Sequence, residues 1–165
     1  MKNILIIIVI SFLFACNSAS KSVDQLWKEG QEYRIENNYK DAITNFKIII
    51  SNYPENKLSS KAQFQIADIY LNDIKNYEYA IKEFKTVVEL YSNDSDAKKS
   101  LFMIAYIYNN YMNAYTDAIT YYNLFKNKYP NDELIPSVEY ELNGLIHIES
   151  QIDSLNSISN EKSNI

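Results

Sequence analysis

The sequence predicts an all-α fold, a solenoid of antiparallel helix pairs, and three observations support this prediction. A motif recurs at a constant step along the chain, apolar residues within each unit have helical spacing, and glycine is nearly absent. Only 2 of the 165 residues are glycine. A sheet-rich domain or a phosphate-binding loop needs glycine at positive-φ turns, so both are excluded. The length suits a single domain.

The repeated motif is clearest around an Ala-Ile pair. Ala42-Ile43 recurs as Ala80-Ile81 and again as Ala118-Ile119, so the residue number advances by 38 at each step. The same step relates two sets of aromatic residues, which are Phe46, Phe84 and Tyr122, and Tyr53, Tyr91 and Tyr129. Chance does not keep so many positions in register, so the chain contains three copies of one structural unit.

Each unit has the pattern of two helices. The apolar residues of the first unit's second half are spaced by 4, 3 and 4 residues, which places them on one helix face: Ala42, Phe46, Ile49 and Tyr53. Pro54 and Pro130 end helices, and Asn37-Asn38 favours a tight turn within the pair. The predicted helices are residues 22–37, 39–52, 57–73, 76–91, 95–111, 115–128 and 132–150. The polar residues 151–165 are expected to fray as a C-terminal tail.

Small residues mark the places where paired helices approach each other. A small side chain lets two helix backbones come close, so these positions are predicted to be packing contacts. On the second helices they are Ala42, Ala80 and Ala118, and on the first helices they are Gly30, Ala67 and Ala105. Between its two small residues, the first unit is one residue shorter than the later units.

The N-terminus has the pattern of an export signal. Lys2 precedes a run over residues 4–14 that is apolar except for Ser11, and the small Ala15 follows it, which is typical of a secretory signal. Eleven helical residues span only about 16 Å, roughly half the hydrocarbon core of a bilayer. We therefore interpret residues 1–15 as a signal peptide rather than a membrane-spanning helix.

The end of this segment, Leu13-Phe14-Ala15-Cys16, resembles the lipobox of bacterial lipoproteins. Cys16 is the only cysteine in the chain, and an odd free thiol is unusual in an exported protein. The resemblance implies cleavage before Cys16, acyl chains on that residue that anchor the protein in the membrane, and a tether over residues 16–21. Asn17 in place of aspartate favours the outer membrane, with the protein facing the periplasm. A plain secretory signal with an incidental cysteine is the alternative.

Composition argues against catalysis. The single histidine, His147, and the single cysteine leave no basis for a metal site or a Ser-His-Asp relay. Carboxylates two residues apart, such as Glu139 and Glu141, point to different sides of a helix and are interpreted as solvated charges. We predict no catalytic residue, no metal and no cofactor, hence no enzyme. The net charge of −5 argues against nucleic acid as a partner.

The repeated unit resembles the tetratricopeptide repeat. That family has a small residue, a tyrosine, an alanine, an aromatic residue and a proline at set positions, matched here by Gly30, Tyr33, Ala42, Phe46 and Pro54. The resemblance covers residues 22–150 and departs in its period of 38 rather than about 34 residues. It implies a right-handed solenoid of about three repeats and a closing helix.

The resemblance also implies a concave groove lined by the first helices of the pairs. One register holds a ladder of four aromatic rings, and neighbouring positions add a cation and a further tyrosine. The expected partner-binding residues are Trp27, Arg34, Phe64, Phe102, Tyr106 and Tyr140. Aromatic residues serve as anchors for a bound peptide or helix. The alternative is that the rings pack between helices and complete the core, as helical aromatic stripes usually do.

Long units that end in Tyr-Pro are similar to those of the BamD/YfiO family of outer-membrane assembly lipoproteins. This implies a lipid-anchored periplasmic scaffold that binds envelope proteins or peptide segments. That family usually has five repeats, whereas this chain has about three and a half. The units are also similar to those of CpoB, which implies a coordinator acting with Tol or cell-wall synthesis proteins. A generic envelope adaptor and a ligand-binding lipoprotein are further alternatives.

Overall fold

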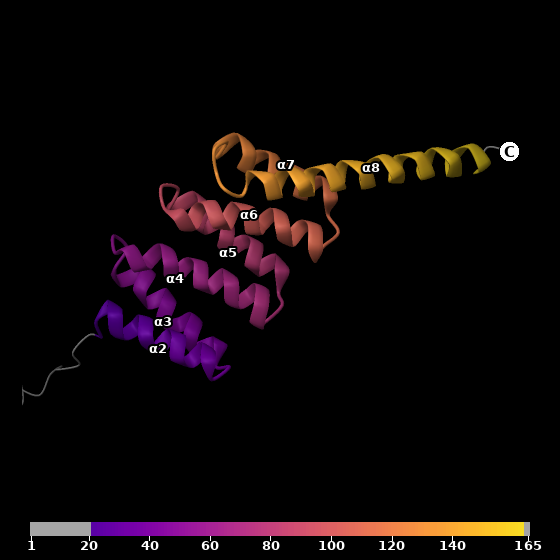
Figure 1. Cartoon of the computed structure of the whole chain (residues 1–165). Helices are drawn as coiled ribbons and strands as arrows, with labels where there is room; N and C mark the ends of the chain where they lie inside the picture. The colour runs from indigo at the N-terminus through magenta and orange to yellow at the C-terminus, as the bar shows by residue number, and fades with distance from the viewer. Residues whose placement is uncertain (1–20, 164–165) are drawn as a thin grey trace, which may run out of the picture.

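Helices packed in chain order build the whole fold (Figure 1). The computed structural model describes residues 21–163. Its elements are α2 (Val23–Ile35), α3 (Tyr39–Asn52), α4 (Lys57–Asp68), the π-helix η1 (Ile69–Asp73), α5 (Tyr77–Leu90), α6 (Ser95–Asn110), α7 (Tyr115–Lys128) and α8 (Ile135–Ser163). Each helix packs mainly on its neighbours in the sequence, which confirms the predicted all-helical stack.

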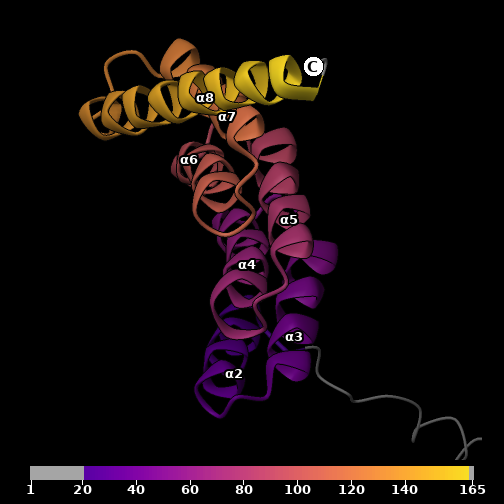
Figure 2. The ribbon, with the colours of Figure 1, turned by 90° about the vertical axis from the view of Figure 1, so that its right-hand side faces the viewer.

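The stack has two layers. The first helices of the pairs, α2, α4 and α6, lie above one another, and α3 and α5 form a second column beside them (Figure 2). First helices also contact each other directly, α2 with α4 and α4 with α6. We call the surface of α2, α4, α6 and the start of α8 that faces away from the second helices the first-helix face.

A left-handed residue joins the two helices of each pair. Asn37, Lys75 and Asn113 have φ values of 60°, 59° and 51°, and they are separated by the same step as the sequence motif. Asparagine tolerates this conformation better than most residues, which is why the predicted turn falls at Asn37. The Asn38 side chain then accepts a hydrogen bond from the Asp41 N–H and caps α3.

The longer second and third units accommodate their extra residue in a widened helical turn. In the second unit the Ile74 N–H donates to the Ile69 carbonyl at 2.9 Å, and in the third the Met112 N–H donates to Ile107 at 3.2 Å. A bond from residue i to residue i−5 holds one more residue per turn than an α-helix does. The helix predicted over residues 57–73 therefore ends as the π-helix η1.

The core divides into three clusters, one for each helix pair. Each cluster contains a fully buried ring from a second helix, contributed by Phe46, Phe84 or Tyr122. The small residues predicted as packing contacts are all buried, and the five alanines Ala42, Ala67, Ala80, Ala105 and Ala118 are 0% exposed. Buried small side chains let the helices of a pair lie close enough for the rings to meet.

Gly30 is needed because of the ring of Phe46. A Cβ atom at Gly30 would lie 2.8 Å from Cε1 of Phe46, so the ring or the helix would have to move. Overpacking lowers the free energy of unfolding by about 1–3 kcal/mol. The better helix propensity of alanine offsets about 1 kcal/mol of this loss. We expect Gly30→Ala to lower the free energy of unfolding by about 1 kcal/mol in urea denaturation.

Gly144 in α8 provides the matched control. A Cβ atom there would meet nothing within 4 Å, so only the helix propensity changes. Gly144→Ala is therefore expected to raise the free energy of unfolding by up to about 1 kcal/mol. Equal effects of the two substitutions would contradict a packing role for Gly30.

The last helix departs most from the prediction. It begins at Ile135 rather than near residue 132, because Asp132 caps the preceding turn by accepting the Leu134 N–H at 3.0 Å. It continues to Ser163 instead of ending near residue 150, so residues 151–163 are helical and project beyond the stack (Figure 1). Within the described residues, no helix combines the length and the apolar character that crossing a membrane requires.

Candidate functional site

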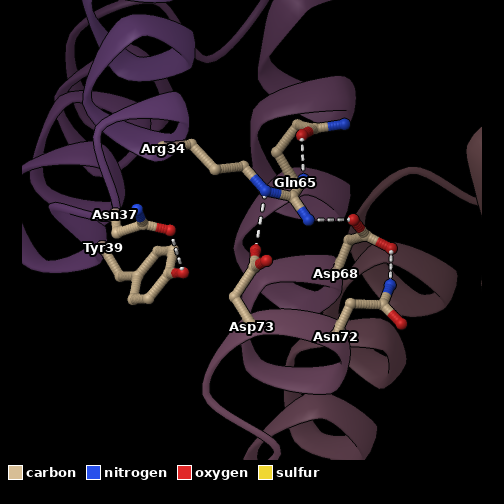
Figure 3. A network of polar contacts seen from close by, with 7 residues as sticks. All are labelled: Arg34, Asn37, Tyr39, Gln65, Asp68, Asn72 and Asp73. Atoms are coloured by element: carbon tan, nitrogen blue, oxygen red, sulfur yellow. Dashed lines mark hydrogen bonds and ion pairs between the residues drawn. The ribbon is translucent and has the colours of Figure 1, made fainter.

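Arg34, near the end of α2, connects this helix to α4 and η1 (Figure 3). Its guanidinium donates from Nη2 to Asp68 Oδ2 at 2.6 Å, from Nε to Asp73 Oδ2 at 2.7 Å, and from Nη1 to Gln65 Oε1 at 2.8 Å. Asp68 also accepts a bond from Asn72 at 2.7 Å. The side chain of Arg34 is 20% exposed. The structure thus gives this expected groove residue three bonds within the chain.

The contact between Arg34 and Gln65 belongs to the repeat. In the next unit the equivalent residues are Leu71 in η1 and Met103 in α6, which lie in one hydrophobic cluster. At the last step Asn109 donates from Nδ2 to Glu141 Oε2 at 2.8 Å, which joins α6 to α8. One register therefore ties each first helix to the next, with a polar pair at both ends of the stack and an apolar pair in the middle.

Three of the four ladder rings pack on the second helix of their own pair. The ring of Trp27 lies 5.4 Å from Phe46 and that of Phe64 lies 5.2 Å from Phe84, measured between centroids. Phe102 meets Tyr122 edge-on at 5.8 Å. These three rings are partly buried. They complete the core, as the packing interpretation expects, and leave only part of each ring to a ligand.

Tyr140, the fourth ladder residue, is different. Its side chain is 79% exposed, although it lies one repeat step after Phe102. The second helix that would receive its ring is not present among the described residues, since α8 is the last element. The four positions therefore do not form one continuous strip of equally exposed rings.

Tyr106, the tyrosine expected beside the ladder, is partly buried like the three packed rings. Its ring stacks on Phe102 at 6.5 Å and meets Tyr111 edge-on at 5.9 Å, and Tyr111 in turn stacks on Tyr77 at 4.7 Å. Burial raises the pKa of the Tyr106 phenol, with smaller contributions from Tyr111 and Glu141. The rings of Tyr106, Tyr111 and Tyr77 thus form one aromatic cluster with Phe102.

Other predicted residues are also accounted for. His147 is exposed and contacts Gln151 at 3.1 Å between their side-chain nitrogens. No group of three or more His, Cys, Asp or Glu side chains that could hold a metal occurs in the part of the chain that the structure describes. Cys16, the predicted lipidation site, lies outside the described residues. The site with most support is therefore the first-helix face, which offers charged and aromatic groups rather than reactive ones.

Comparison with known families agrees with this architecture. The sequence model of the tetratricopeptide repeat matches residues 61–94 and 99–132, two segments whose starts are separated by the same step as the motif. Residues 61–132 are tetratricopeptide repeats. The matches cover the units built on α4 with α5 and on α6 with α7. No curated protein matches the chain. Tetratricopeptide repeats generally serve as scaffolds for protein–protein interaction and are typically not catalytic.

Sequence reasoning missed the partners of Arg34 and Asn109. Gln65 and Glu141 are two repeat steps apart, and a search for polar residues in that register would have found them. Asp73 gave no such signal, because it comes near Arg34 only through the widened turn of η1. Its role depends on the tertiary structure of the tetratricopeptide unit.

Proposed function

We propose that this tetratricopeptide protein is an exported, lipid-anchored scaffold that binds an envelope protein or peptide on its first-helix face. The observation that carries the proposal is the combination of a tetratricopeptide repeat fold and an N-terminal segment ending in Ala15-Cys16. Acyl chains on Cys16 would hold the protein at the membrane. The described fold begins five residues later, at Lys21.

Contacts at Lys21 support a short tether. The Tyr53 hydroxyl donates to the Lys21 carbonyl at 2.8 Å, and the Lys21 ammonium pairs with Glu29 at 2.6 Å. The chain is thus held against the ends of α2 and α3 where the tether meets the fold. A body fixed this close to an anchored residue would keep one end of its stack at the bilayer.

The first-helix face offers a mixed set of groups to a partner. Lys61 and Lys99 are exposed and one repeat step apart, so they present two cations in line. Tyr106 is partly buried and lies one repeat step after Asp68, whose carboxylate is already bonded to Arg34 and Asn72. Such a face suits an extended or helical segment with acidic residues and an apolar anchor. The acidic residues would meet Lys61 and Lys99, and the apolar anchor would meet Tyr106.

Within this function, assembly of outer-membrane proteins is the more specific proposal, resting on the similarity to the BamD/YfiO family. The repeats begin directly after the tether, as they do in that family. Coordination with Tol or cell-wall synthesis proteins is the second candidate. The two candidates differ in the identity of the bound protein, so an experiment that identifies it separates them.

Photo-crosslinking in cells tests the face. A photoreactive amino acid at Lys61 or at Lys99 is expected to trap the same partner, identified by mass spectrometry. Lys47, exposed on α3 in the second layer, is the control position and is expected to trap none. Equal crosslinking from Lys47 would contradict the face. An outer-membrane assembly component supports the first candidate, and a Tol or cell-wall protein supports the second.

The anchor needs its own test. Mass spectrometry of the mature protein is expected to show an N-terminal Cys16 carrying acyl groups. Cys16→Ser should release the protein from the membrane fraction. A mature protein with an unmodified Cys16 would contradict the lipid anchor while leaving the binding face intact.

A further inference from the structure

Lys85, on the second helix α5, contacts two tyrosine rings rather than a carboxylate. Its ammonium lies 5.2 Å from the ring centroid of Tyr121 on α7 and 5.9 Å from that of Tyr108 on α6. The two rings stack on each other at 5.5 Å between centroids. Hydrogen bonding to Tyr121 raises the pKa of Lys85, while burial acts in the opposite direction. Lys85 is therefore a partly buried cation at the junction of α5, α6 and α7.

The chain provides no carboxylate in contact with this cation. Lys85 forms no ion pair with any carboxylate whose side chain the structure describes, although Glu89 lies one turn further along α5. An aromatic ring attracts a cation through its electron-rich face but carries no net charge. The ammonium is thus left with a positive charge that an anion from outside the chain can contact.

The preceding junction of the stack, between α3, η1 and α5, has a carboxylate at the corresponding place. One repeat step before the three residues of the later junction lie Lys47, Tyr70 and Glu83. Burial raises the pKa of Tyr70, and the Glu83 carboxylate raises it further because it lies close to the phenol. The later junction therefore has the neutral ring of Tyr121 where the earlier one has an anion.

A hollow adjoins Lys85. Its volume of about 520 Å³ is in the usual range for sites that bind small molecules. Ile81 and Met112, which pack in one hydrophobic cluster, give the hollow apolar walls, and Tyr108 adds an aromatic one. Most of its lining residues belong to α5, a helix of the second column in Figure 2. The hollow is therefore separate from the first-helix face.

The lining also includes two carboxylates, which limit the charge of a ligand. Along α5 the charged lining residues follow in the order Glu78, Lys82, Lys85 and Glu89. The ammonium of Lys82 lies 5.8 Å from the ring centroid of Tyr79, so it too contacts a ring. An anionic group at the centre of the hollow would meet the two lysines. A second negative charge on the ligand would approach a glutamate, so a ligand with one charge fits better.

We propose that this hollow binds a small aromatic monocarboxylate, with the carboxylate on Lys85 and the ring against Ile81, Tyr108 and Met112. The ligand's carboxylate supplies the negative charge that Glu83 provides at the preceding junction. Tyrosine rings and methionine sulfur both make favourable contacts with an aromatic ring. The proposal depends neither on the lipid anchor nor on the partner of the first-helix face.

Equilibrium dialysis with 2-naphthoate tests the site on the full chain in detergent. The same detergent without protein fills the other chamber, so uptake of the probe by micelles cancels. We expect saturable binding of one naphthoate per chain. The neutral analogue 2-naphthalenemethanol has the same rings and is expected to bind more weakly by about tenfold or more, because it lacks the charged acceptor. Added salt should weaken naphthoate binding.

Variants of the chain locate the bound carboxylate. Lys85→Met removes the charge and keeps a long side chain, so it is expected to weaken binding by about tenfold or more. Tyr121→Glu gives this junction the carboxylate of the preceding one and should weaken binding as well. Lys47→Met, at the corresponding position of the preceding junction, is the matched control and should leave binding unchanged. Circular dichroism checks that each variant is folded.

Three results would overturn the proposal. The first is the absence of saturable naphthoate binding to the unmodified chain. The second is equal binding of the neutral analogue, because the hollow would then select apolar molecules without regard to charge. The third is binding that a folded Lys85→Met variant retains in full. Crosslinking from Lys61 and Lys99 is independent of each of these outcomes.

Discussion

Replacing Phe84 with alanine is expected to lower the free energy of unfolding by about 3–5 kcal/mol. The ring is 0% exposed and receives Phe64 edge-on at 5.2 Å between centroids. Its removal leaves a cavity between α4 and α5 and also removes the partner of Phe64. Globular domains are stable by only about 5–15 kcal/mol, so the change is a large part of the total. Urea denaturation followed by circular dichroism measures it.

Tyr140→Ala is the matched control for this prediction. Tyr140 is in the same register as Phe64, but its side chain is 79% exposed, so truncation removes little buried surface. We expect a change within about 0.5 kcal/mol. A loss comparable to that of Phe84→Ala would mean that Tyr140 is buried in solution.

Replacing Arg34 with methionine is expected to lower the free energy of unfolding by about 2–3 kcal/mol. Hydrogen bonds to charged groups are among the stronger ones in proteins. Removing the arginine also leaves the carboxylates that it contacts without a compensating charge. Asp68 and Asp73 are each 24% exposed, so water compensates them in part. Chemical denaturation with and without salt measures the loss, which should be smaller in high salt.

Two further variants separate this network from ordinary surface charge. Lys28→Ala breaks an ion pair with Glu32 whose side chains are 78% and 54% exposed, and it should change stability by less than about 0.5 kcal/mol. Adding Asp68→Asn to Arg34→Met should cost less than the sum of the two single changes, because both remove the same interaction. Strict additivity would contradict the network.

A stack of this kind places its stability and its binding surfaces on different residues. The rings that look most suited to a ligand in the sequence, Phe64 and Phe102, are used mainly for packing. The exposed cations of the first-helix face are Lys61 and Lys99, and Lys99 lies 3.5 Å from the carboxylate of Asp96. Substitutions at these positions should therefore affect partner binding with little effect on folding.

Sequence periodicity was sufficient to predict most of the architecture. The constant repeat step, the helical spacing and the buried alanines follow from local rules, because every unit must bury the same stripe against the next one. The residues of the predicted packing contacts are buried, and most helix bounds agree closely with the prediction. The extra residue of the later units was visible, but its accommodation in a widened turn at Ile69 and Ile107 was not.

The candidate site was less predictable, because it depends on what lies across from each side chain. Arg34 was a plausible groove cation until the structure placed Asp68, Asp73 and Gln65 around it. Tyr140 has the same register as Phe102 and differs only in lacking a helix to cover it. Register states which face a residue occupies, whereas exposure depends on whether another element reaches that face.

The sequence by itself determined that the chain is a regular repeat of helix pairs, because hydrophobic periodicity and small residues act locally. Only the tertiary structure decided which aromatic rings are core, which charges are paired, and where the repeat remains open on α8. Those properties depend on contacts between helices that are far apart in the sequence, and local rules do not specify them.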